Sequence, residues 1–223
     1  MLRLVALDMD GTLVDVESSY HTVHAYFGER NDDGLRRFEA NEIDDAEFVR
    51  TDVRIWKKHR PDLRLEEIDR ILAGAPLMPG AETLVRGLRA QGVTTALVSG
   101  GIDLLGHRVA RDLGIDVVLA NGFEVDDAGR LTGEGIVRVP IWEKERVVAE
   151  LQDRLGIGPD ETASVGNSEI DVGMFRRSRV GIAFKPEDDV VRRGATAIVP
   201  GADLGEVLDV LRAFPDVPPA YRA

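Results

Sequence analysis

Two aspartates near the start of the chain, Asp8 and Asp10, have the spacing and setting of a reactive site. The mostly apolar residues 2–7 precede them and predict a strand buried on both faces. Gly11 follows them and permits a turn that brings both carboxylates to one place. Two negative charges this close repel each other unless a cation lies between them. Because the chain has no Cys and 4 His, its residues favour a hard, oxygen-binding cation such as Mg²⁺. For an isolated Asp-x-Asp pair, a simple turn or helix cap is the alternative.

A serine and two glycines form a second candidate site. Ser99, Gly100 and Gly101 follow the predicted strand 93–98 and precede the predicted helix 102–113. A hydroxyl group and glycine N–H groups at the N-terminus of a helix can hold a phosphate group. The same residues could form an ordinary cap with a tight turn, so they are informative only together with the other stretches.

Two more stretches carry suitable side chains at the ends of predicted elements. Lys144 lies near the start of the predicted helix 142–155, where it could bind a phosphate group or simply lie on the surface. Residues 164–171 end a predicted strand with oxygen-bearing side chains, among them Asn167 and Asp171, that suit a hard cation. Ligands of parallel sheets bind beyond the carboxyl ends of the strands, where we expect all of these stretches to meet.

The rest of the chain predicts the scaffold that positions these residues. From residue 76 onward, strands alternate with helices, which indicates a three-layer α/β fold with a doubly wound, mostly parallel sheet. Residues 15–75 instead have apolar positions at helical spacing between turn signals, and predict three or four short helices that could act as a lid. Turn signals in residues 122–139 predict a β-hairpin. The expected parts are an α/β catalytic core (1–14 and 76–223), a small helical cap (15–75), a short β-hairpin flap and a loose tail (215–223).

Composition restricts the classes of function. The chain has 223 residues, 43% of them hydrophobic and 30% charged, as expected of a globular protein with one large domain or a core with an insert. The net charge of −12 argues against nucleic acid or an anionic membrane as the partner. No apolar run approaches the roughly 20 residues that span a bilayer. The absence of Cys excludes disulfides and thiol chemistry and fits a cytoplasmic location.

Together, the four stretches resemble the four motifs of the haloacid dehalogenase superfamily, specifically its phosphoserine-phosphatase-like branch. The resemblance covers nearly the whole chain. The sequences of residues 97–101, of Ala120-Asn121 and of residues 131–133 are also similar to that branch. It implies a Rossmann-like core with a helical cap inserted after the first strand. It also implies a Mg²⁺-dependent phosphatase that acts through an aspartyl-phosphate.

The resemblance assigns a role to each candidate residue. Asp8 would be the nucleophile, and Asp10 the general acid and base. Ser99 and Lys144 would bind the phosphoryl group. The metal-site residues it implies are Asp8, Asp10 (through its backbone carbonyl), Asn167 and, in support, Asp171. The substrate-binding residues it implies are Thr12, Glu17 and Gly100.

One departure from the family pattern concerns the metal site. The fourth motif usually reads Gly-Asp-x-x-Asn-Asp, whereas residues 166–171 read Gly-Asn-Ser-Glu-Ile-Asp. Asn167 can offer a carbonyl oxygen, but it removes a negative charge from the expected site. Metal affinity should fall unless Glu169 or Asp171 takes over that role.

A second departure concerns the substrate. The arginine that binds the substrate carboxylate in the family aligns with Asp52. Arg50 or Arg54 could replace it only if the helix that carries them is rotated or shifted in register. The phosphoryl machinery is therefore retained in the sequence, whereas the selectivity for phosphoserine is open.

The function predicted from these features is Mg²⁺-dependent hydrolysis of a phosphomonoester, a small phosphorylated metabolite with phosphoserine as the first candidate, by a monomer or homodimer. Asp10 argues against a dehalogenase, because release of halide needs no acid. One alternative is a phosphotransferase that passes the phosphoryl group to a small alcohol. Another is a catalytically weakened member that binds a phosphorylated ligand without turnover, which Asn167 motivates.

Overall fold

A computed structural model describes residues 1–213, and the tail predicted at residues 215–223 lies outside this part. Seven strands form one sheet in the order β4-β3-β2-β1-β5-β6-β7, and every neighbouring pair is parallel except β3 and β4. The strands are β1 (Leu4–Leu7), β2 (Thr94–Ile102), β3 (Val117–Val125), β4 (Leu131–Ile136), β5 (Thr162–Gly166), β6 (Val180–Phe184) and β7 (Ala197–Val199). The predicted mostly parallel α/β sheet is confirmed.

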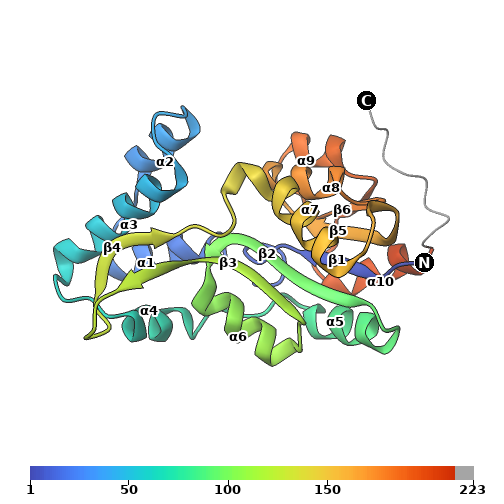
Figure 1. The fold of residues 1–223 in the computed structure, drawn as a ribbon, viewed down its shortest axis with the longest axis horizontal. Helices are drawn as coiled ribbons and strands as arrows, with labels where there is room; N and C mark the ends of the chain where they lie inside the picture. The colour runs from blue at the N-terminus through green and yellow to red at the C-terminus, as the bar shows by residue number, and fades with distance from the viewer. Residues whose placement is uncertain (214–223) are drawn as a thin grey trace.

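Helices cover both faces of this sheet (Figure 1). One face carries α5 (Ala81–Ala90) and α6 (Asp103–Leu113), and α10 (Val207–Arg212) packs against α5. The other face carries α7 (Lys144–Leu155), α8 (Val172–Arg176) and α9 (Asp189–Gly194). The fully buried strand β1 serves both layers: Leu4 and Ala6 pack in the cluster that includes α7, and Val5 and Leu7 pack in the cluster that includes α5. A strand apolar on both faces is what this position requires.

Residues 15–75, all within the described part, hold four α-helices that lie together at one end of the sheet (Figure 1). They are α1 (Ser19–Phe27), α2 (Asp32–Glu39), α3 (Asp45–His59) and α4 (Leu65–Leu72). Side chains of Ser18, Asn31 and Asp44 cap the first three, as residues of these types do at helix N-termini. Trp56, Ile68 and Leu72 are fully buried at the centre of this segment.

The β-hairpin is also present, but its first strand is longer than expected. The first strand of the predicted hairpin is the second half of one continuous element, β3, whose first half pairs with β2 and whose second half pairs with β4. The hairpin lies along α3 (Figure 1), and Gly135 of β4 lies directly against Val49. β3 therefore belongs both to the sheet and to the surface that the helical segment covers.

The register of the central strands brings the predicted stretches together. Leu7 of β1 lies opposite Leu97 of β2 and opposite Val165 of β5. Because all three strands run in the same direction, the residues after them meet at one edge of the sheet. Among the described residues, none of the helices has the length and apolar character needed to cross a membrane.

Candidate active site

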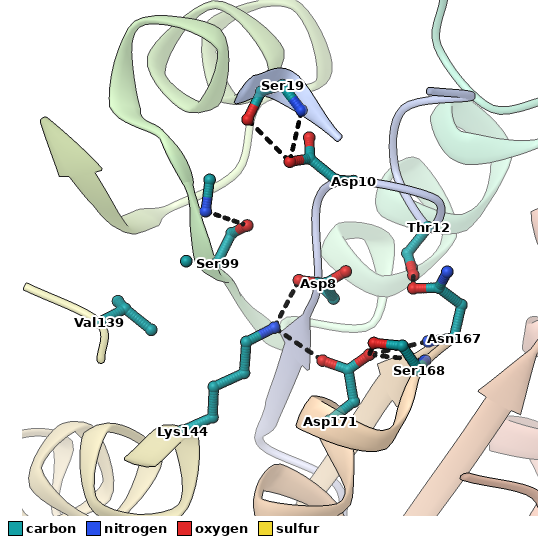
Figure 2. Close-up of polar contacts among 12 residues, drawn as sticks. Asp8, Asp10, Thr12, Ser19, Ser99, Val139, Lys144, Asn167, Ser168 and Asp171 are labelled. Atoms are coloured by element: carbon teal, nitrogen blue, oxygen red, sulfur yellow. Dashed lines mark hydrogen bonds and ion pairs between the residues drawn. The ribbon is translucent and has the colours of Figure 1, made fainter. Parts of the chain in front are cut away.

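A lysine ammonium group joins two buried carboxylates at this edge (Figure 2). The Nζ atom of Lys144 lies 2.6 Å from Oδ1 of Asp8 and 2.7 Å from Oδ1 of Asp171. Asp8 directly follows β1, Lys144 begins α7, and Asp171 ends a 3-10 turn (Glu169–Asp171) after β5. None of the three side chains is more than 5% exposed, and buried charges are retained only when they are paired. Lys144 is therefore buried between two carboxylates and is not a surface lysine.

This pairing keeps Lys144 positively charged, and burial in the same group shifts the pKa of Asp8, the candidate nucleophile. Burial alone would lower the pKa of Lys144, but the carboxylates of Asp171 and Asp8 outweigh it and raise that pKa above its usual value. Burial, and then the charge of Asp171, raises the pKa of Asp8 to about 7, and the Lys144 ammonium group opposes this rise. A cation at this edge would favour the ionised form of Asp8 further.

Asp10 is held by one oxygen and leaves the other one free (Figure 2). Its Oδ2 atom accepts hydrogen bonds from the backbone N–H of Ser19 at 2.9 Å and from the Ser19 hydroxyl at 2.8 Å. Its Oδ1 atom is buried and has no hydrogen-bond partner among the described residues. Burial raises the pKa of Asp10, and the bonds from Ser19 oppose the rise. A carboxyl group of this kind can carry a proton and pass it to a bound ligand.

Sequence reasoning did not identify Ser19, although a signal was present. Of the two serines at the start of α1, Ser18 accepts hydrogen bonds from N–H groups of the first turn and caps the helix. This leaves the Ser19 hydroxyl for Asp10, and its oxygen also accepts the N–H of Ile102 at 3.0 Å. Ser19 thus links the first helix, the Asp10 carboxylate and the end of β2.

The Ser99 stretch lies at the predicted place but in a different conformation. β2 continues to Ile102, so these residues are extended and bulged backbone and not the N-terminus of a helix. The Ser99 oxygen accepts the N–H of Gly101 at 3.0 Å, which leaves the hydroxyl hydrogen to donate. A Cβ atom on Gly101 would lie 2.6 Å from Oδ2 of Asp10 and 2.7 Å from Oγ of Ser19, so only glycine permits this approach.

A buried asparagine fixes the loop opposite Ser99. The carbonyl oxygen of the Asn121 side chain accepts the N–H groups of Arg138 and Val139, both at 2.8 Å. Its amide donates to the backbone oxygens of Gly100 at 3.1 Å and Val139 at 2.9 Å. Asn121 therefore joins the end of the hairpin to the Ser99 stretch, a role that only the three-dimensional structure reveals.

Two predicted roles are corrected by the hydrogen bonds around residue 167. Thr12 is fully buried behind Asn167, to whose Oδ1 atom its hydroxyl donates at 3.2 Å, and it does not line the cavity described below. Asp171 binds Lys144 with one oxygen, and with the other it accepts the N–H groups of Asn167 at 2.9 Å and Ser168 at 3.1 Å (Figure 2). With both oxygens engaged, Asp171 positions the lysine and the loop and is not a free metal ligand.

The remaining donors fit a hard cation. They are the second carboxylate oxygen of Asp8, the backbone carbonyl of Asp10 and the Oδ1 atom of Asn167, which keeps one lone pair besides the one that accepts the Thr12 hydroxyl. Oxygen donors of this kind suit Mg²⁺. A Cβ atom on Gly11, whose φ is 74°, would lie 2.3 Å from the Asn167 amide, so the two loops approach closely only because residue 11 is glycine. Within the described residues, no group of three or more His, Cys, Asp or Glu side chains could hold a metal ion. A cation at this place therefore depends on the backbone carbonyl and the amide oxygen.

A cavity of about 280 Å³ opens from Asp8 and Asp10 toward the four helices, and Ser99, Gly100 and Glu17 also line it. Arg50 and Arg54, which were predicted to bind substrate, do not. Arg50 lies 2.6 Å from Glu134 of the hairpin, and Arg54 is 63% exposed and pairs with Glu47. The two arginines lie outside the cavity because the face of α3 that carries Arg50 packs on β4.

The wall of the cavity at Asp52 is a buried hydrogen-bonded group. Nε2 of His24 lies 2.7 Å from Oδ1 of Asp52, and the amide of Asn31 donates to the same oxygen at 2.7 Å. The indole N–H of Trp56 donates to Nδ1 of His24 at 3.1 Å. Because an indole nitrogen can only donate, Nδ1 carries no proton and His24 is the neutral tautomer with its proton on Nε2. Asp52 therefore has two neutral donors and no cation beside it.

The chain is similar to known proteins in sequence and in fold. Residues 5–176 match the haloacid dehalogenase-like hydrolase family. The phosphoserine phosphatase of Archaeoglobus fulgidus is 34% identical over 188 residues, which are 83% of this chain and 53% of that protein. The phosphoserine phosphatase of Idiomarina loihiensis is 32% identical over 191 residues, which are 81% of each chain. This chain thus spans about half the length of the Archaeoglobus protein.

A solved structure of a substrate-bound phosphoserine phosphatase complex superposes with a TM-score of 0.80 over 94% of this chain and 98% of that chain, at 24% sequence identity. That likeness shows the fold. The chain belongs to the haloacid dehalogenase-like hydrolase family. Within it, the chain is a phosphatase of the branch whose curated relatives are phosphoserine phosphatases.

Proposed function

We propose that this chain is a Mg²⁺-dependent phosphomonoester hydrolase of the cytoplasm that acts on a small phosphorylated metabolite through an aspartyl-phosphate on Asp8. The observation that carries the proposal is the pair of carboxylates with different surroundings. Asp8 is fixed by a lysine ammonium group at 2.6 Å, whereas Asp10 keeps one buried oxygen without a partner. Residues 15–75 would form the cap over the site, and residues 1–14 and 76–223 the core.

In the first half-reaction, an oxygen of the Asp8 carboxylate attacks phosphorus and the bond from phosphorus to the ester oxygen breaks. Asp10 donates its proton from the free Oδ1 atom to the leaving alkoxide, because its raised pKa keeps that proton available. The Lys144 ammonium group balances the negative charge on the phosphoryl oxygens, and the Ser99 hydroxyl donates a hydrogen bond to them. The alcohol then leaves the cavity.

In the second half-reaction, the ionised Asp10 takes a proton from a water molecule, whose oxygen attacks the phosphorus of the aspartyl-phosphate. The bond between phosphorus and Asp8 breaks, which releases inorganic phosphate and restores the carboxylate. A Mg²⁺ ion held by Asp8, the Asp10 carbonyl and Asn167 would supply positive charge next to the phosphoryl group. Asp171 keeps Lys144 in place throughout.

Phosphate release from a panel of small phosphomonoesters tests this proposal. We expect release with Mg²⁺ and a fall of at least about a hundredfold in EDTA, which added Mg²⁺ reverses, because the cation neutralises the incoming phosphate. Release that EDTA leaves unchanged would contradict the metal dependence. Transfer to an added alcohol in place of phosphate release would identify a phosphotransferase, and no reaction of any ester would favour a ligand-binding member of the family.

The chemistry at the far end of the cavity bears on the substrate. Phosphoserine is the first ester to test, because the curated relatives are phosphoserine phosphatases. Its carboxylate, however, needs a positive partner. Burial raises the pKa of Asp52, which in either protonation state offers no positive charge. Among the described residues that line the cavity, Arg30 is the one lysine or arginine. Its guanidinium group is 66% exposed and already pairs with Asp32 at 3.0 Å.

A matched pair of esters tests this feature. Phosphoethanolamine has the amine and the phosphate of phosphoserine but no carboxylate. We expect its kcat/KM to be at least about tenfold higher than that of phosphoserine, because a carboxylate beside Asp52 would lose a solvent shell without gaining a partner. Steady-state phosphate release gives both values. A kcat/KM for phosphoserine ten times that of phosphoethanolamine would instead place a carboxylate-binding group in this cavity.

A further inference from the structure

Two residues of the acidic run 187–189, at the start of α9, make different contacts. Asp188 caps this helix, since its Oδ1 atom accepts the N–H of Val191 at 2.8 Å. Glu187 does not cap it: its side chain lines the cavity and lies against Asn167. An acidic run before a helix suits the helix dipole, and Asp188 serves this helix, whereas Glu187 faces the cavity.

Two hydrogen bonds fix Glu187 on Asn167. The backbone N–H of Glu187 donates to the backbone carbonyl oxygen of Asn167 at 2.9 Å. In the side chains, Nδ2 of Asn167 donates to Oε1 of Glu187 at 2.7 Å. A carboxylate can only accept, so the amide of Asn167 must turn its nitrogen to Glu187 and its oxygen to the Thr12 hydroxyl. Asn167 is 4% exposed, so this orientation is held inside the protein.

The carboxylate of Glu187 has acidic neighbours and, within residues 1–213, no ion pair with a lysine or arginine. Glu187 lies near Asp171, Asp188 and Glu17, all of which are acidic. The ammonium group of Lys144 already compensates one of the two carboxylates that it touches, which leaves one net negative charge in that group. Asp8, Asp171, Lys144 and Glu187 together carry two net negative charges when all four are ionised, the charge that a divalent cation balances.

We propose that Glu187 and Asn167 act as one unit at the cation site, in which Asn167 offers its amide oxygen and Glu187 supplies the negative charge that an aspartate at position 167 would carry. This inference rests on the Mg²⁺ dependence proposed above. It also explains how the chain tolerates Asn167. Asp171 is already engaged, and Glu169 is exposed and does not line the cavity, so neither compensates for the missing charge. Glu187 acts through Asn167 and is a positioning residue.

Binding of the metal alone tests the proposal without relying on turnover. The affinity of the full chain for Mg²⁺ is measured by calorimetry, and that for Mn²⁺ by electron paramagnetic resonance, in the absence of any ester. We expect E187Q to weaken both by about tenfold or more, as loss of groups that orient metal ligands does. Glutamine can still accept the Asn167 amide hydrogen bond, so this change removes the charge and keeps the contact. E169Q, at an exposed acid two residues from Asn167, is the matched control and should change affinity less than about twofold.

A charge exchange makes the test specific. In N167D/E187Q, the negative charge returns to position 167 and leaves position 187, and we expect metal affinity within about threefold of the unchanged chain. If E187Q binds both metals as the unchanged chain does, or if the double variant binds no better than E187Q, the inference is wrong. Melting temperatures without metal confirm that each variant is folded.

These outcomes separate the inference from the function on which it rests. An unchanged chain that hydrolyses esters in EDTA, and binds no divalent cation, overturns the metal dependence and this inference with it. An unchanged chain that binds the metal, with E187Q binding it equally well, overturns only the role of Glu187.

Discussion

Replacing Asp8 with asparagine is expected to lower phosphate release by at least about a thousandfold, because an amide oxygen does not replace a carboxylate as the attacking group. The fold should persist, since the asparagine oxygen can still accept the 2.6 Å hydrogen bond from Lys144. Acid-quenched enzyme should show a phosphorylated protein by mass spectrometry for the unchanged chain and none for this variant.

The control for this experiment is Asp15→Asn, which changes an exposed aspartate of the same N-terminal stretch. Asp15 pairs with Lys185 at 3.2 Å on the surface, and a surface ion pair contributes little to stability. Activity in Asp15→Asn should stay close to that of the unchanged chain. Full activity in Asp8→Asn would mean that another residue receives the phosphoryl group.

Replacing Lys144 with methionine is expected to cost both activity and stability. The variant leaves Asp8 and Asp171 buried without the ammonium group between them, and removing one partner of a buried ion pair destabilises a protein by about 3–5 kcal/mol. Phosphate release should fall at least about a thousandfold, because the same group balances the phosphoryl charge. Urea unfolding in EDTA, compared with Lys58→Met at an exposed lysine, measures the free energy of unfolding.

The pH dependence of this loss follows from the direction of the Asp8 shift. Burial and Asp171 already raise the pKa of Asp8 from 3.8 to about 7, and removal of Lys144 should raise it further. A carboxyl group whose pKa is higher in the folded state costs stability as the pH rises through that interval, because the folded protein must ionise it. The Lys144→Met variant should therefore lose least stability near pH 5 and most above pH 7. A deficit that is equal at both values would show that lost packing, and not charge, destabilises it.

The parts of the fold and site that could be predicted are those encoded in contiguous residues. The apolar run before Asp8 defines a central strand, and the parallel register of β1, β2 and β5 then places Ser99 and Asn167 near it. Lys144 needed the resemblance, because a lone lysine near a helix start has no local signal that separates a buried ion pair from a solvated side chain. Its burial depends on carboxylates from two other elements.

The parts that could not be predicted depend on which neighbour a side chain meets. Arg50 turns to Glu134, which lies 84 positions later in the chain and comes close only when the hairpin packs on α3. Glu187 turns to Asn167 because α9 starts beside the β5 loop. The continuity of β3 was missed because its first and second halves pair with different strands, so neither half shows the period of an isolated hairpin.

The attachment of the helical segment to the hairpin has a consequence for recombining this protein with its relatives. Besides its two covalent connections to the sheet, the segment binds the hairpin: Lys57 donates to the Leu131 oxygen at 2.6 Å, and the Leu131 N–H donates to Leu63 at 2.9 Å. Part of the boundary of residues 15–75 is thus made by β4, whose Leu131 lies 74 positions after Lys57 in the chain. A chimaera that exchanges the helices alone would separate these partners, so the unit of exchange is the helical segment together with β3 and β4.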